Sequence, residues 1–133
     1  MTANKIRIFK GKVFKNNLGN LIKYISSNSS FFRKFGEVYF NHIKFKRTKG
    51  WIRHKKNSCL IQCVHGKVKF VLVDKKENKK TLTLNSKTGD ILLIPPKIWF
   101  SFTSVLKDSI IVNTLEKPHN DSEIEKRSQL KKS

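Results

Sequence analysis

A succession of short apolar segments separated by turn residues is the feature that most constrains the fold of this chain. From residue 37 onward each segment is about four to eight residues long and rich in Val, Ile, Leu, Phe or Thr, as strands are. Gly, Pro, Asn and Asp stand between the segments. The pattern favours a β-sandwich or barrel over alternating strands and helices. The expected strands are 38–45, 58–64, 67–73, 81–84, 90–94, 98–103 and 109–115.

The residues before this run are also expected to be ordered. Apolar residues recur through the first 35 positions and supply more apolar surface than a disordered tail carries. We expect strands near 5–14 and 20–25, joined by a turn rich in Asn and Gly.

The other end of the chain, 116–133, is polar and is predicted to be a tail or one short helix over 121–127, capped by Asp121 or Ser122. A length of 133 residues is that of one ordinary domain, so we expect a single all-β domain over 1–133.

Composition restricts the setting in which this domain works. No stretch approaches the eighteen or so apolar residues of a membrane span, and basic residues interrupt the first twelve positions. We therefore expect a cytoplasmic protein without a membrane partner. Cys59 and Cys63 lie four residues apart in an apolar stretch, which indicates buried reduced thiols and not a secreted disulfide framework.

The chain is strongly basic, with 29 Lys and Arg against 9 Asp and Glu and a formal net charge of +20. A basic surface attracts nucleic acid. Most of these residues are Lys, however, whose point charges attract phosphate without reading base edges as Arg does. Any nucleic-acid binding is therefore expected to be weak and nonspecific.

Two blocks of the chain carry the spacing of a known barrel motif. Four residues separate His54 from Cys59 and six separate Cys59 from Gly66; Gly89 is followed by five residues and Pro95. This spacing resembles the two motifs of the cupin family, in which three His and one Glu converge on a metal inside a jelly-roll barrel. The four ligand positions of the family fall here on Ile52, His54, Cys59 and Phe100.

Three of these four positions lack the donors that a first-row divalent ion requires, so we predict that no metal is bound. A soft site made by His54, Cys59 and Cys63 is the alternative, because residues 59, 61 and 63 share one face of a strand. Two cysteines on an apolar strand are more often packed in the core, and this interpretation is favoured.

Five further blocks extend the resemblance in their order and spacing: 17–21, 36–40, 49–56, 71–74 and 94–99. Together they resemble the dTDP-4-dehydrorhamnose 3,5-epimerase family and are similar to the dTDP-sugar 3,4-ketoisomerases. The resemblance implies a cupin jelly-roll homodimer that binds a nucleotide-linked 4-keto-6-deoxy sugar, needs no cofactor and serves polysaccharide biosynthesis. Apolar front strands that would otherwise leave an open sheet edge also favour the homodimer.

The chemistry of this family moves a proton from a carbon beside a keto group, which requires a base and a stabilised oxyanion. The epimerases take the base from an Arg-Gly-x-His run, which reads Lys49-Gly50-Trp51-Ile52 here. The ketoisomerases use a His-x-His pair, of which only His54 remains. The resemblance therefore makes His54 the candidate catalytic residue, with altered or lost catalysis because its partner is absent.

Substrate-binding residues follow from the same alignment of motifs. Lys49, Arg53 and Lys55 are placed beside the pocket mouth, where they would either neutralise a diphosphate or form a solvated basic edge. Strand alternation turns Trp51 and Trp99 away from the interior. The remaining candidates line an apolar pocket: Ile52, Cys59, Ile61, Phe100 and Phe102.

The leading hypothesis is thus a sugar-nucleotide epimerase or isomerase that is either active through His54 or reduced to binding. The alternative is a non-catalytic basic cupin that binds nucleic acid or a protein partner.

Overall fold

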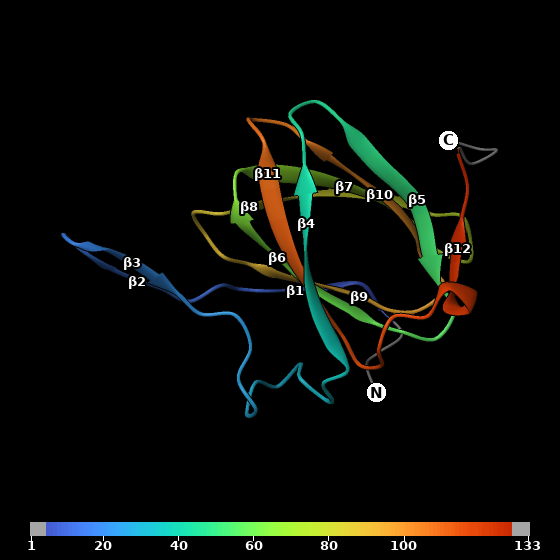
Figure 1. The fold of residues 1–133 in the computed structure, drawn as a ribbon, viewed down its shortest axis with the longest axis horizontal. Coiled ribbons are helices and arrows are strands. Elements are labelled where there is room, and N and C mark those ends of the chain that lie inside the picture. The colour runs from blue at the N-terminus through green and yellow to red at the C-terminus, as the bar shows by residue number, and fades with distance from the viewer. Residues whose placement is uncertain (1–4, 129–133) are drawn as a thin grey trace.

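Two five-stranded antiparallel sheets face each other and enclose the core, as Figure 1 shows. The structure is a computed structural model that describes residues 5–128. The first sheet has the order β1 (Arg7–Phe9), β9 (Ile91–Ile94), β6 (Cys59–His65), β11 (Ser109–Leu115) and β4 (Glu37–Ile43). The second has the order β12 (Ile124–Lys126), β5 (Thr48–His54), β10 (Trp99–Ser104), β7 (Lys67–Val73) and β8 (Lys79–Asn85). A hairpin of β2 (Val13–Asn16) and β3 (Gly19–Ile22) projects from this body.

Strand alternation builds the core between the sheets. In β7, Val68, Phe70 and Leu72 are fully buried, while the residues between them are partly or wholly exposed. The Phe70 ring packs against Phe102 of β10 with the ring centroids 5.5 Å apart. Each such side chain removed from water stabilises the fold by about 1.5–3 kcal/mol before the entropy of ordering is counted. The all-β jelly-roll fold class expected from the sequence is confirmed.

Most expected strands lie within one or two residues of the observed ones, but the single strand expected near 5–14 is divided into β1 and β2, and β5 was missed. Its sequence is mainly polar and contains Gly50 at a φ of 107°, a conformation that other residues rarely adopt. A Cβ at Gly50 would lie 2.7 Å from the carbonyl oxygen of Phe100, so the close approach to β10 also requires glycine. The strand exists because β10 and β12 bond to its two edges, and not because of its own apolar pattern.

The expected helix over 121–127 is wrong. One turn of 3-10 helix spans Asp121–Glu123, and Asn120 caps it by accepting a hydrogen bond from the backbone N–H of Ser122. The chain then enters β12, which pairs with β5. Backbone bonding to a neighbouring strand outweighs the weak helix preference of this short polar segment. The last part of the predicted tail, 129–133, lies outside the described residues.

Within residues 5–128 no helix is long and apolar enough to span a membrane.

Candidate functional site

A cavity of about 370 Å³ lies between the two sheets. Five of the nine predicted site residues line it: Ile52, His54, Ile61, Phe100 and Phe102. The cavity wall is completed by residues of β4, β11, β12 and the loop before the 3-10 turn: Glu37, Tyr39, Asn41, Ile111, Asn113, His119, Ile124 and Lys126.

Strand alternation explains why the two central strands present an apolar wall. Ile52 and His54 are two residues apart in β5 and therefore face the same side. Ile52 pairs with Phe100 of β10, and the rings of His54 and Phe100 stack with centroids 6.4 Å apart. His54 thus sits in the cavity wall with only 4% of its surface exposed.

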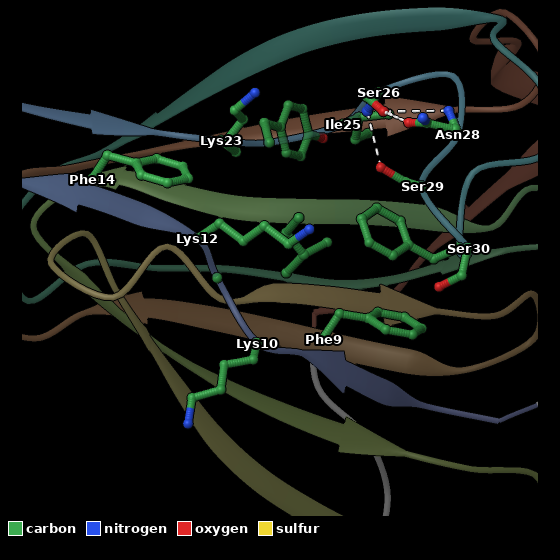
Figure 2. Close-up of a pocket in the computed structure, with 14 residues that line it drawn as sticks. Phe9, Lys10, Lys12, Phe14, Lys23, Ile25, Ser26, Asn28, Ser29 and Ser30 are labelled. Carbon is green, nitrogen blue, oxygen red and sulfur yellow. Dashed lines mark hydrogen bonds between the residues drawn. The ribbon is translucent and has the colours of Figure 1, made fainter.

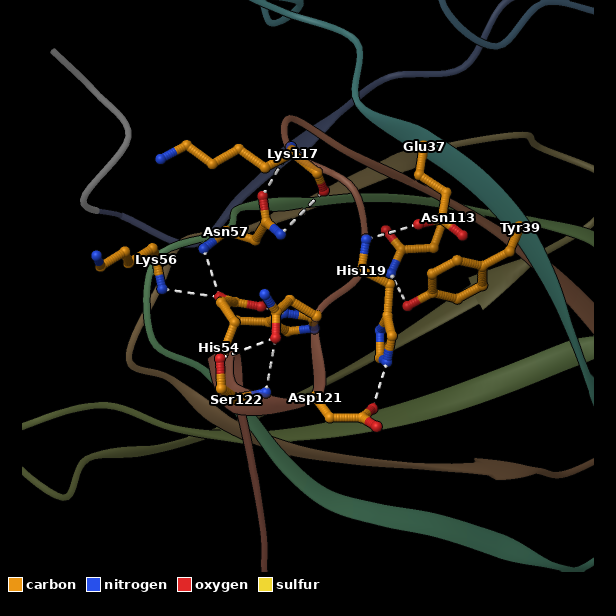
Figure 3. Close-up of polar contacts among 12 residues, drawn as sticks. Glu37, Tyr39, His54, Lys56, Asn57, Asn113, Lys117, His119, Asp121 and Ser122 are labelled. Carbon is orange, nitrogen blue, oxygen red and sulfur yellow. Dashed lines mark hydrogen bonds and ion pairs between the residues drawn. The ribbon is translucent and has the colours of Figure 1, made fainter.

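A carboxylate from the C-terminal segment contacts this histidine. His54 Nδ1 lies 2.9 Å from Glu123 Oε1. The other carboxylate oxygen accepts hydrogen bonds of 2.8 Å from the backbone N–H groups of Lys56 and Asn57. Since an ionised carboxylate only accepts, Nδ1 carries the proton. Figure 3 shows Lys56, Asn57 and His54 gathered around this network.

Asn57 fixes the turn that holds the carboxylate. Its side chain is buried and bonds Lys117 twice, accepting from the backbone N–H at 3.0 Å and donating to the carbonyl at 3.2 Å. The turn after β5 is therefore tied to the chain that leaves β11. This leaves Glu123 in one defined position against His54.

The His54–Glu123 pair sets the charge inside the cavity. Burial by itself lowers the pKa of His54, but the neighbouring Cys59 and the Glu123 carboxylate outweigh burial and raise that pKa to about 9. For Glu123, burial raises the pKa, but the backbone N–H groups and His54 bring it below its usual value. At neutral pH the cavity therefore contains an imidazolium, which can donate a proton or hydrogen bond to an oxygen atom.

A second polar pair lies across the cavity. Asn113 Nδ2 donates a 3.1 Å hydrogen bond to the hydroxyl of Tyr39. The other amide atom, Asn113 Oδ1, is buried and has no hydrogen-bond partner among residues 5–128. An unpaired buried carbonyl costs about 1–3 kcal/mol, so this atom is suited to a ligand that brings a donor. Burial raises the pKa of Tyr39 to about 12, which keeps its hydroxyl protonated.

The other predicted site residues lie outside the cavity lining. Lys49 is near its edge, where Nζ donates to Asn41. Arg53 points to the opposite side of β5 and bonds Glu125 at 2.7 Å. Lys55 is exposed and Cys59 is buried in the core.

Sequence reasoning missed the partners of His54 and the polar pair. Tyr39 and Asn41 alternate along a predicted strand, so their shared face was a usable signal, and Asn113 lies on the next strand of the same sheet. Glu123 gave no signal, because it is 69 positions from His54 and fell within a wrongly expected helix.

Metal ligands are not gathered anywhere in the part of the chain that the structure describes. Among residues 5–128 no group of three or more His, Cys, Asp and Glu side chains is placed to hold an ion.

A second pocket of about 520 Å³ lies outside the barrel, between the base of the hairpin and the segment 23–31 (Figure 2). The Lys12 side chain reaches into this pocket, while that of Lys10 points away from it. Its lining includes Phe9, Phe31 and several serines, but no histidine or carboxylate. It therefore lacks a group for acid-base chemistry near neutral pH, and the cavity between the sheets is the candidate site.

Comparison with protein families identifies the family of this chain. The model of the FdtA family, described as WxcM-like, C-terminal, matches residues 4–132. The chain belongs to the FdtA family. Comparison with curated proteins gives no match.

Solved structures share the fold of this FdtA-family protein. A dTDP sugar isomerase from Desulfovibrio desulfuricans is 24% identical with a TM-score of 0.89, and the match covers 96% of this chain and 86% of that one. The sugar 3,4-ketoisomerase QdtA from Thermoanaerobacterium thermosaccharolyticum, solved with TDP, is 20% identical with a TM-score of 0.81, covering 96% and 91%. A dTDP-4-dehydrorhamnose 3,5-epimerase from Bacillus anthracis, solved with TDP and PPi, is 14% identical with a TM-score of 0.83, covering 95% and 80%. The resemblance stated from the sequence is thus confirmed in family and fold.

The stability of this FdtA-family protein is expected to depend on pH through His54. A pKa of about 9 in the fold lies above the usual 6.5, so the stabilisation is complete below about pH 6.5 and is lost as the pH rises towards 9. The difference corresponds to about 3 kcal/mol in the free energy of unfolding. Urea denaturation between pH 6 and 9 measures it.

The variant Glu123→Gln should weaken this dependence without abolishing it, because Cys59, which also raises the pKa of His54, remains. Glu116→Gln is the matched control, because it makes the same charge change at a carboxylate that pairs with the exposed Arg33. Lys126, Glu37 and His119 also line the cavity and are unchanged in both variants. Equal slopes for the two variants would contradict the role given to Glu123.

Proposed function

We propose that the cavity binds a nucleoside-diphosphate 4-keto-6-deoxy sugar and that His54 exchanges a proton with the oxygen of its keto group. The observation that carries the proposal is the buried His54–Glu123 pair in the cavity wall of an FdtA-family jelly roll. Supporting it, the solved neighbours of this fold include dTDP-sugar isomerases and epimerases.

The chemistry follows from the charge of His54. Transfer of a proton to solvent from the carbon beside a ketone leaves an enolate, whose negative charge resides largely on the oxygen. An imidazolium next to that oxygen stabilises the charge and can protonate it, giving the enol. Return of a proton from solvent to C4 of the enediol, with loss of the proton on O3, would give the 3-keto sugar, whereas return to C3 with loss of the proton on O4 would restore the 4-keto sugar.

The remaining walls suit a sugar that lacks one hydroxyl. Asn113 Oδ1 would accept from a sugar hydroxyl, while the Tyr39 hydroxyl is placed to donate. Phe100, Phe102 and Ile111 present an apolar surface to the 6-methyl group. A volume of about 370 Å³ is within the range of small-molecule sites.

Lys49 and Lys126 are the cations placed to meet the diphosphate. Lys126 lines the cavity, and Lys49 bonds Asn41, which also lines it. Arg53 is already engaged by Glu125 on the outer side of the sheet. We therefore give the phosphate contact to the two lysines and not to Arg53.

Ile52 limits catalysis in this scheme. It occupies the position from which the family's first histidine would reach the sugar, and its side chain cannot accept a proton. The protein is accordingly proposed to bind the sugar and stabilise its enolate, with proton removal as the slow step.

Ligand-induced stabilisation tests this function. Saturating dTDP-4-keto-6-deoxyglucose at about a hundred times its Kd should raise the free energy of unfolding by about 2.7 kcal/mol and Tm by on the order of 10 °C. Lys49→Gln should reduce the rise, whereas Lys69→Gln, an equal charge change at an exposed position of β7, should not. If no dTDP sugar raises Tm while RNA does, the nucleic-acid alternative replaces the proposal.

We also propose a homodimer in which the hairpin of one copy packs on the outer side of the partner's β4. Phe14 and Leu21 of the hairpin are 57% and 56% exposed, and Phe40 of β4 is 68% exposed. Exposed aromatic and aliphatic residues on a projecting hairpin and on an edge strand are typical of an interface.

Light scattering is expected to give twice the chain mass of 15.5 kDa. Phe40→Asp should yield a monomer, whereas Leu106→Asp, which changes a residue that is 58% exposed in the loop before β11, should remain dimeric. A wild-type monomer at every concentration would exclude the dimer.

A further inference from the structure

A cluster of charged and aromatic side chains covers the outer side of the cavity wall. The guanidinium carbons of Arg53 and Arg127 lie 4.7 and 4.8 Å from the centre of the Trp99 ring. Arg53 Nε also bonds Glu125 Oε1 at 2.7 Å. Trp99 is 8% exposed, so this cluster screens the indole from water. The three elements β5, β10 and β12 are thereby joined on the side of the sheet that faces away from the cavity.

β12 depends on such contacts because it is a short edge strand. It has three residues and pairs on one side only, with β5 (Figure 1). The main-chain bonds between Trp51 and Arg127, 3.1 Å in both directions, extend this pairing by one residue. Edge strands of this length separate readily unless side chains hold them.

The same strand carries the inner wall of the site. Ile124 and Lys126 line the cavity, while Glu125 between them points outward to Arg53. Glu123, which immediately precedes β12, reaches His54. Movement of β12 away from β5 would therefore pull Glu123 against the backbone N–H groups of Lys56 and Asn57 that hold its carboxylate beside His54.

We propose that Arg53, Trp99 and Arg127 are positioning residues that hold β12 on β5 and thereby keep Glu123 bonded to His54. The meaning of this for catalysis rests on the proposed function, because it concerns the state of His54 that would act on the sugar. The physical coupling itself exists in the ligand-free protein. A surface cluster remote from the ligand would then determine how firmly the buried histidine is bonded to its carboxylate.

The direction in which the pKa of His54 changes when Arg127 is replaced distinguishes this coupling from simple electrostatics. Removing the positive charge of Arg127 should by Coulomb's law raise the pKa of a nearby histidine. If Arg127 instead holds β12, its loss separates Glu123 from His54, and burial then lowers that pKa. Glu123 and Cys59 are the groups that raise it, while Lys126, His119 and Glu37 line the same cavity.

The experiment is an NMR titration of His54 in the ligand-free chain of 133 residues, with its signal assigned by its loss in His54→Asn. Arg127 is exposed, so Arg127→Gln is compatible with folding. This variant should lower the pKa of His54 by at least about 1 and accelerate exchange of the Lys55 amide, which donates to the Glu123 carbonyl. Arg127→Lys keeps the charge but not the planar group, and should give a smaller fall. Arg33→Gln, an equal charge change elsewhere, should give none.

An unchanged or raised pKa of His54 in Arg127→Gln would overturn the proposal, as would equal values in Arg127→Lys and the wild type. Since no ligand is present, a protein that binds no nucleotide sugar would still show the predicted fall. Failure of the proposed function and failure of this coupling are thus separate results.

Discussion

Replacing Ile52 with histidine is expected to raise the rate of isomerisation of dTDP-4-keto-6-deoxyglucose by at least about 100-fold, the usual contribution of a positioned base. Ile52 lines the cavity two residues before His54 on the same face of β5, so an imidazole there would share the site with the existing imidazolium. The position is only half-buried, which makes a polar side chain tolerable. Exchange of solvent deuterium into the carbons beside the keto group measures proton removal directly.

Ile52→Asn is the control for this variant, since it has a polar side chain of similar length that does not titrate near neutral pH. It should bind the sugar as Ile52→His does and show no gain in exchange. Equal exchange in the two variants, with binding retained, would show that the missing base is not what limits the reaction.

Replacing His54 with asparagine is expected to reduce deuterium exchange by about 100-fold or more in the Ile52→His background. The amide can donate a hydrogen bond, but it carries no positive charge to stabilise the enolate and no proton to transfer to it. Binding of the sugar should be largely kept, because Tyr39, Asn113 and the apolar walls remain. Rates and thermal shifts are to be measured on the same preparations at a temperature where the variant is folded.

The double variant also shows whether the two histidines act as a unit. If His54 only shapes the cavity, its loss will alter KM and leave kcat nearly unchanged. Turnover equal to that of Ile52→His would rule out the proton-transfer role of His54, whatever the effect on binding.

The charge of +20 overstates the number of arginines that are free to contact a ligand. One of its five arginines, Arg53, is paired with a carboxylate and stacked on Trp99. Arg127 stacks on the same ring, and Arg33 pairs with Glu116. These three arginines are already engaged within the chain. Most of the other basic residues are lysines. Lysines attract anions over a distance without selecting among them.

The sequence determined the barrel and much of its lining. Apolar residues at every second position of β7 place Val68, Phe70 and Leu72 in the core, because strand side chains alternate between two faces. The spacing of the two motifs placed Ile52, His54 and Phe100 on one wall, because these positions are close in sequence or adjacent in strand register. Such relations depend on local geometry, which the order of residues largely fixes.

Only the tertiary structure decided the charge of His54 and the partner of Arg53. Glu123 reaches His54 because the C-terminal segment forms a strand that pairs with β5 and not the expected helix. The unpaired backbone groups at the edge of β5 favour this pairing. The same pairing brings Glu125 to Arg53, which strand alternation already turns away from the cavity. Contacts between residues about 70 positions apart arise from the closing of the whole barrel, and no local pattern in either segment encodes them.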